Sequence, residues 1–211
     1  FTMTMEQRIA PATPFQSKIG QPVLCSAVEI AAERVLLRPI SEGDAWEIFD
    51  NFTAEVTRYM FPQAPDRLDE TLEFIRTSLA GMERGENLQF VIVNKKSGDF
   101  LGCCGLYGHG NPTTPELGVW LKIAAHGSGR GREAIAALVR WAERHLHYEY
   151  LTYPVDRGNI PSRIIPEALG GEIFEEALCP RQDGRFLDIV IYRIYPRGAE
   201  EENGSFELTA V

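Results

Sequence analysis

A glycine-rich turn between a strand pattern and a helix pattern constrains the fold of this chain more than any other feature. The turn consists of His126, Gly127, Ser128, Gly129, Arg130 and Gly131. Before it, over residues 115–123, apolar residues alternate with polar or small ones, as in a strand with one buried face. After it, over residues 132–146, apolar residues recur at helical spacing. This order predicts a strand, a tight turn and an amphipathic helix.

A turn of this kind suits an anionic ligand. Glycines let the backbone approach a ligand closely, and the first turn of a helix offers unpaired N–H groups and a partial positive charge. Phosphate and diphosphate groups are typical ligands of such a site. The chain lacks a P-loop, because Arg132 and Glu133 stand where that motif needs Lys and Ser or Thr. The glycine spacing does not fit a dinucleotide-binding turn either. A purely structural turn is the alternative.

Length and composition predict one domain with appendages. The chain has 211 residues, 44% of them hydrophobic, which is enough for one substantial core. We expect an N-terminal extension at residues 1–30, a domain at 31–195 and a loose acidic tail at 196–211. No segment approaches the roughly 20 apolar residues of a membrane-spanning helix, and the first residues lack the apolar core of a secretory signal. We therefore expect a cytoplasmic protein with no membrane partner.

Charge and cysteine usage narrow the classes of partner. A formal net charge of −9 argues against direct nucleic-acid binding, because contact with phosphates needs clustered Lys and Arg. An acidic surface can attract cationic amines, or it can simply aid solubility. The four cysteines lack metal-ligand spacing, so we expect reduced, mostly buried thiols and no metal site.

The remaining periodicities predict a mixed α/β sheet. Strands are expected at residues 34–40, 88–93, 100–107, 115–123 and 150–155, helices at 68–82, 132–146 and 159–169, and a final hairpin at 172–178 and 187–195. Ser41 and Asp44 form a capping box before a further helix. Gly170 and Gly171 stand where a helix C-terminus is expected.

Several segments together resemble the GNAT acetyltransferase superfamily. Its acyl-CoA-binding motif is Gln or Arg, any two residues, Gly, any residue, then Gly or Ala; Gly129 and Gly131 match it, and His126 stands at its first position. Residues 116–120 resemble the fourth strand of the family, and residues 159–162 resemble the start of its second conserved region. The resemblance implies a mixed, mostly antiparallel sheet with a central parallel pair of strands and flanking helices.

A second resemblance, in residues 34–60, indicates one group within the superfamily. Residues 34–39, Ser41, Asp44 and residues 57–60 resemble the Rim-type acetyltransferases, which modify the N termini of ribosomal proteins. This resemblance implies transfer of an acetyl group from acetyl-CoA to a primary amine, either a protein N terminus or a small molecule. The protein N-terminal α-amine is favoured, and the pattern leaves room for an oligomer.

The resemblance also implies the site residues. The cofactor site would comprise Trp120, Leu121, Ile123, His126, Gly127, Ser128, Gly129, Arg130, Gly131, Asn159 and Ser162. The pantetheine arm would pass between splayed strands around Trp120 and Thr152. Glu116 would take the amine proton, directly or through water, and Ser162 would lie near the departing sulfur. Many superfamily members use a tyrosine in the helix at 159–169 as general acid, and this chain has none there.

Each assignment has an alternative. Glu116 could be a solvent-facing strand carboxylate or part of a salt bridge, Asn159 and Ser162 could simply cap a helix, and Trp120 could belong to the core. His109, in a loop that could border the acceptor, could carry protons or be merely solvent-exposed. For the whole chain, the alternatives are a small-molecule amine acetyltransferase and a non-catalytic acyl-CoA-binding module.

Overall fold

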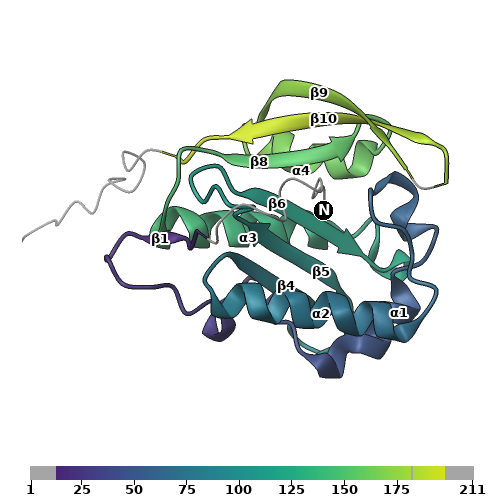
Figure 1. Ribbon diagram of the computed structural model, residues 1–211, viewed down its shortest axis with the longest axis horizontal. Coiled ribbons are helices and arrows are strands. Elements are labelled where there is room, and N and C mark those ends of the chain that lie inside the picture. The colour runs from purple at the N-terminus through teal and green to yellow at the C-terminus, as the bar shows by residue number, and fades with distance from the viewer. Residues whose placement is uncertain (1–12, 182, 198–211) are drawn as a thin grey trace, which may run out of the picture.

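The computed structural model describes residues 13–181 and 183–197 (Figure 1). It is built on an eight-stranded sheet in the order β2-β3-β4-β5-β6-β8-β10-β9. The strands are β2 (Ile30–Ala31), β3 (Val35–Pro39), β4 (Asn87–Asn94), β5 (Phe100–Tyr107), β6 (Glu116–Leu121), β8 (Leu151–Asp156), β9 (Glu172–Pro180) and β10 (Phe186–Ile194). A separate two-stranded pair joins β1 (Gln16–Ser17) to β7 (Leu146–His147).

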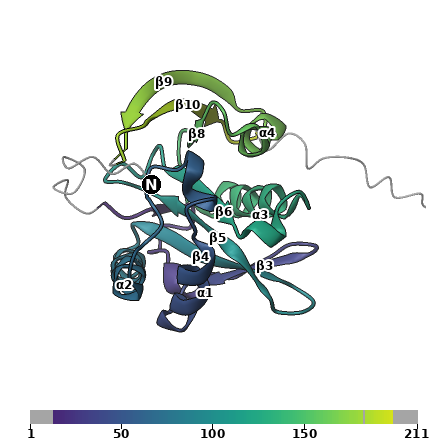
Figure 2. The ribbon, with the colours of Figure 1, turned by 90° about the vertical axis from the view of Figure 1, so that its right-hand side faces the viewer.

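Helices cover both faces of this sheet (Figure 2). On one face lie α1 (Ala45–Asn51) and α2 (Leu68–Glu83), and on the other α3 (Arg130–His145) and α4 (Ile160–Ala168). Four short 3₁₀ helices complete the order: η2 (Cys25–Ala27), η3 (Glu42–Asp44), η4 (Val56–Tyr59) and η5 (Ile123–Ala125). Within the residues described, no helix combines the length and the apolar character needed to cross a membrane.

One strand pair departs from the antiparallel pattern. Neighbouring strands of the main sheet are antiparallel except β6 and β8, which are parallel and pair at a single position, Glu116 with Thr152. The Thr152 N–H donates to the Pro115 carbonyl over 2.9 Å. Since the ladder stops there, the two strands separate along the rest of β6. This is the predicted mixed sheet with a central parallel pair.

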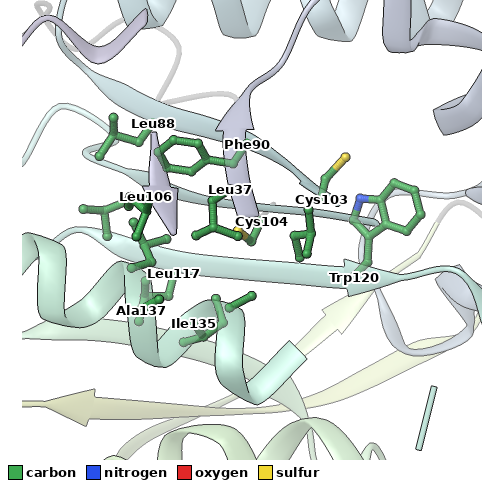
Figure 3. Close-up of a cluster of buried hydrophobic side chains, with 14 of the residues drawn as sticks. Leu37, Leu88, Phe90, Cys103, Cys104, Leu106, Leu117, Trp120, Ile135 and Ala137 are labelled. Atoms are coloured by element: carbon green, nitrogen blue, oxygen red, sulfur yellow. The ribbon is translucent and has the colours of Figure 1, made fainter. Parts of the chain in front are cut away.

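The core fills both faces of the central strands (Figure 3). Leu117 points toward Ile135 and Ala137 of α3, whereas Trp120 points to the opposite face. Side chains of neighbouring strand residues alternate between faces, yet both Cys103 and Cys104 are buried because helices cover both.

The expectation of reduced, mostly buried thiols is confirmed. The cysteines are free; three are buried and Cys179 is half-buried. Burial raises the pKa of Cys103 and Cys104, which keeps both protonated and unreactive.

Local signals placed the helix boundaries well. Asp44 accepts a hydrogen bond from the Ser41 N–H over 2.8 Å, so the predicted capping box is present. Helix α3 begins at Arg130, two residues earlier than predicted, because Gly129 adopts a left-handed conformation with φ of 73° and serves as N-cap. Gly170, with φ of 77°, follows the end of α4 as expected.

Much of the expected N-terminal extension packs on the domain. Phe15 and Cys25 are buried, and the Phe15 N–H donates to the Gly85 carbonyl over 2.8 Å. Residues 1–12 of the extension and residues 198–211 of the expected acidic tail lie outside the described residues. The domain boundaries stay predictions.

Candidate active site

A cavity of about 850 Å³ lies where β6 and β8 separate. It runs from Glu116, at the closed end of the strand pair, to the glycine turn before α3. Eleven of the predicted site residues line it: Glu116, Trp120, Leu121, Ile123, His126, Gly127, Ser128, Gly129, Gly131, Asn159 and Ser162. Arg130 is the exception, and Thr152 is not among the lining residues either. The passage of the pantetheine arm between the strands near Trp120 and Thr152 stays a prediction; Thr152 pairs with Glu116, which does line the cavity.

The glycine turn presents a run of unbonded backbone donors. Within the described part of the chain, none of the N–H groups from Gly127 to Arg132 donates a hydrogen bond. The next amide, that of Glu133, donates to the Gly129 carbonyl over 3.0 Å and so closes the first helical turn. Six consecutive donors at a helix N-terminus, beside a cavity, form an anion-binding arrangement.

Internal hydrogen bonds hold this turn in shape. The Ser128 hydroxyl donates to the Ala125 carbonyl over 2.8 Å, and the His126 Nε2 lies 2.9 Å from the Leu121 carbonyl oxygen. His126, which stands at the first motif position, therefore braces the turn through that nitrogen. Gly127 and Gly129 both have φ near +70°, a conformation that favours glycine.

Arg34, which directly precedes β3, holds the turn in place through hydrogen bonds and an ion pair. The Arg34 guanidinium donates to the Ser128 carbonyl over 3.1 Å and pairs with Glu133 at 2.7 Å, and the Arg34 N–H also donates to Glu133. Beside this ion pair lies a second hollow of about 410 Å³. Four arginines line it: Arg34, Arg132, Arg140 and Arg197. Glu33 and Glu133 also line this hollow, and Arg34 pairs with Glu133 as Arg197 does with Glu143, so the hollow carries charges of both signs.

The opposite end of the cavity carries a carboxylate and an imidazole. The Glu116 carboxylate is 14% exposed, and its Oε1 lies 3.8 Å from the His109 Nε2. That distance is an ion-pair contact rather than a hydrogen bond. Burial acts to raise the pKa of Glu116, but nearby positive charge, that of His109 included, lowers it overall to about 2. Glu116 is therefore not solvent-facing, and His109, stacked on Tyr107, is not a freely exposed loop residue.

A loop from the N-terminal half lines another part of the cavity. Tyr59 and Met60 line it, as does Glu55, which precedes η4. Arg181, which directly follows β9, holds this loop in place by hydrogen bonds. Its buried guanidinium donates to the carbonyls of Thr57, Arg58 and Met60 over 2.8, 3.2 and 2.7 Å. No sequence pattern signals this contact, because it joins segments more than 120 residues apart.

The first turn of α4 brings two predicted residues to the cavity wall. Asn159 caps the helix, with its side-chain oxygen accepting from the Ser162 N–H over 3.4 Å. The Ser162 hydroxyl lies 2.8 Å from the phenolic oxygen of Tyr153, a buried residue of β8 that also lines the cavity. The sequence reasoning looked for a tyrosine only within the helix and missed this one. Leu151, Tyr153 and Val155 alternate along β8 and are buried. This alternation is the sequence signal that could have identified Tyr153 as inward-facing.

Trp120 belongs mainly to the core. Its ring centroid lies 4.8 Å from that of Phe52 and 5.8 Å from that of Phe100, and the residue is 6% exposed. Because strand side chains alternate, Glu116 points to the same face as Trp120, away from α3. Among the described residues, no group of three or more His, Cys, Asp or Glu side chains could hold a metal ion.

Comparison with known families identifies this architecture. The model of the acetyltransferase (GNAT) domain matches residues 34–172. The chain therefore belongs to the GNAT acetyltransferase family, and the predicted fold class and enzyme class, an acetyl-CoA-dependent N-acetyltransferase, are confirmed. No curated protein sequence matches the chain.

Solved structures show the same fold at low sequence identity. RimL, a ribosomal L7/L12 alpha-N-protein acetyltransferase in complex with coenzyme A, superposes with a TM-score of 0.72 at 15% identity, covering 80% of this chain and 98% of its own. Mycobacterium smegmatis RimJ in complex with CoA-disulfide gives 0.69 at 20% identity, covering 86% and 92%. A GNAT-family acetyltransferase from Bacillus anthracis gives 0.69 at 17% identity, covering 80% and 99%.

Proposed function

We propose that this protein transfers the acetyl group of acetyl-CoA to a primary amine, foremost a protein N-terminal α-amine. One observation carries the proposal: the six amides of residues 127–132, which donate no hydrogen bond within the described part of the chain, lie beside a cavity that runs to Glu116. A diphosphate held at the amides would direct the pantetheine arm into the gap between β6 and β8. Arginines of the adjoining hollow, Arg34 and Arg140 among them, would meet the remaining phosphate of the nucleotide.

The gap itself supplies an oxyanion donor. Beyond Glu116, β6 makes no further pairing with β8, so backbone N–H groups on that edge of β6 are free of β8. Such an N–H would stabilise the tetrahedral oxyanion that forms when the amine attacks the thioester carbonyl. The amine nitrogen forms the new bond to carbon, and the carbon–sulfur bonding pair leaves with the CoA thiolate.

Glu116, with His109 beside it, would accept the amine proton directly or through a water molecule. An α-amine has a reference pKa near 8 and lysine one near 10.4, a difference of about 3 kcal/mol in the free energy of deprotonation. A carboxylate and imidazole at the closed end of the cavity are a modest base, which suits an α-amine better than a lysine. RimL, described as a ribosomal L7/L12 alpha-N-protein acetyltransferase, supports the same acceptor.

An acceptor panel tests the proposal. Peptides with free N termini, the same peptides with blocked N termini, lysine-only peptides and small polyamines are incubated with acetyl-CoA, and both CoA release and acetylated product are measured. We expect transfer to the free N termini and none to the blocked ones. Transfer confined to the small amines would support a metabolite acetyltransferase, and acetyl-CoA binding without any transfer would support a non-catalytic module.

A further inference from the structure

Tyr153 and Ser162 form a hydroxyl pair in the wall of the cavity. Tyr153 lies on β8, one residue beyond the end of the β6–β8 pairing, and is 2% exposed. Its phenolic oxygen lies 2.8 Å from the Ser162 Oγ, and both residues line the cavity. Glu116 projects from β6 on the face away from α3, whereas Ser162 lies on α4, which covers the α3 face (Figure 2). The two groups therefore flank the gap from opposite sides.

The geometry fixes what the serine hydroxyl can do. A hydroxyl carries one proton and two lone pairs. If Tyr153 donates to the Ser162 Oγ, the Ser162 proton is left free for a third group. A phenol is the stronger donor of the two, and helix capping by Asn159 holds the Ser162 backbone in place. Because Ser162 lines the cavity, its proton can then point into the cavity.

We propose that Tyr153 is a positioning residue: its phenol orients the Ser162 hydroxyl so that the serine proton stabilises the leaving CoA thiolate. This inference rests on the proposed function, because it places the thioester sulfur at the α4 side of the gap. It gives the chain a substitute for the missing helix tyrosine, delivered from a neighbouring strand and acting through a second side chain.

The pair works by hydrogen bonding and not by proton transfer. Burial raises the pKa of Tyr153 well above that of a thiol, so the phenol keeps its proton. In the collapse of the tetrahedral intermediate, the carbon–sulfur bond breaks and its electron pair goes to sulfur. The thiolate accepts the Ser162 hydrogen bond while the former amine proton stays with the base near Glu116. A thiol with a reference pKa near 8.5 needs no acid to leave.

A matched control stands beside Tyr153 in the sheet. Tyr192 of β10 is its direct cross-strand partner and is equally buried. The Tyr192 hydroxyl donates to Glu167 over 2.7 Å and accepts from Arg163 over 3.0 Å, so it also ties the sheet to α4. Tyr192 is not among the cavity-lining residues. Tyr192→Phe therefore removes a comparable hydroxyl without touching the proposed sulfur site.

The test measures the dissociation constant of free CoA between pH 6 and 10, which needs no turnover. A donor to the thiolate lowers the pKa of the bound thiol below that of free CoA. If the pKa of the bound thiol is about 1 below that of the free thiol, CoA should bind about tenfold more tightly at pH 10 than at pH 6, beyond any change that desulfo-CoA shows. We expect Tyr153→Phe and Ser162→Ala each to abolish this tightening, and Tyr192→Phe to retain it. Retention in Tyr153→Phe, or its absence in the wild type, would overturn the inference.

Turnover provides the second readout. In a double-mutant cycle, Tyr153→Phe should lower kcat roughly fivefold with the KM for acetyl-CoA nearly unchanged, as expected for loss of one hydrogen bond. Added to Ser162→Ala, it should cost nothing more, because Tyr153 acts only through that serine. Additive losses would contradict the inference. Failure of the proposed function would show differently, as absence of acetyl transfer by the wild type with every amine.

Discussion

The two ends of the cavity are built from different material. At the cofactor end the ligand-facing groups are six backbone amides of residues 127–132, set by two left-handed glycines and a helix start. At the proposed acceptor end they are side chains, Glu116 from β6 and His109 from the preceding loop, and the η4 loop held by Arg181 lines a further part of the same cavity. The first end depends on local conformation, and the second depends on contacts between distant segments.

Cofactor binding would thus depend on backbone groups, and the choice of acceptor on side chains. A diphosphate is the same in every acyl-CoA, so a rigid backbone arrangement suits it. Acceptors differ, and side chains on a pinned loop can change without disturbing the fold. We therefore expect substitutions at one end to leave the function of the other end intact.

The largest effect should come from placing a charge in the amide cluster. Gly129→Asp puts a carboxylate at the N-cap, where it accepts from the free amides and repels the diphosphate. Asp and Asn tolerate the left-handed conformation, so folding should survive. CoA affinity should fall on the order of 10³-fold by calorimetry, given about 4 kcal/mol of repulsion at close range. Gly129→Asn, the neutral isostere, should lose far less; equal losses would mean that sterics alone matter.

Removing the proposed base should affect only the acceptor end. Glu116→Gln should lower kcat about 100-fold, the range of one general base, while the dissociation constant for CoA stays within twofold. Glu55→Gln, at an exposed carboxylate lining the same cavity, serves as the control and should retain activity. Full activity of Glu116→Gln would mean that Glu116 is not the base and that solvent or His109 accepts the amine proton.

The pinned loop should control acceptor binding. Arg181→Met removes three hydrogen bonds to the η4 loop, and of the three carbonyls only that of Thr57 keeps another donor within the described part of the chain, the Met60 N–H. The KM for the acceptor should rise about tenfold, the KM for acetyl-CoA should hold, and stability should fall by roughly 3 kcal/mol in denaturant unfolding. Arg185→Met, at an exposed arginine of the same hairpin, should change none of these. A change in the KM for acetyl-CoA instead would contradict the independence of the two ends of the cavity.

The smallest effect should come from an ion pair outside both ends. Burial acts to raise the pKa of Asp44, but hydrogen bonds from Arg38 and Ser41 and the Arg38 charge lower it overall. A depressed folded-state pKa stabilises the protein above the unfolded value near 3.9, and this contribution is lost as pH falls through the folded value. Asp44→Asn should thus cost about 1 kcal/mol at pH 7, with the gap closing below pH 4 in thermal melts and catalysis unchanged. A gap that persists at low pH would contradict the electrostatic origin.

The sequence alone predicts much more of the proposed cofactor end of the cavity than of the proposed acceptor end. The glycine turn, the helix after it and the cap at Asn159 follow from local propensity, which periodicity and turn residues reveal. Tyr153 beside Ser162, and Arg181 beneath η4, join strands to distant loops, and nothing in either local pattern specifies the partner. The register at which β6 and β8 separate depends on the whole sheet, and neither strand pattern specifies it alone.

Backbone amide chemical shifts report whether residues 127–132 bind the diphosphate. In a ¹⁵N-labelled sample, addition of CoA should shift the amide resonances of residues 127–132, whereas pantetheine, which lacks the diphosphate, should leave them in place. Equal shifts with both ligands, or none with CoA, would contradict a diphosphate held by these six donors.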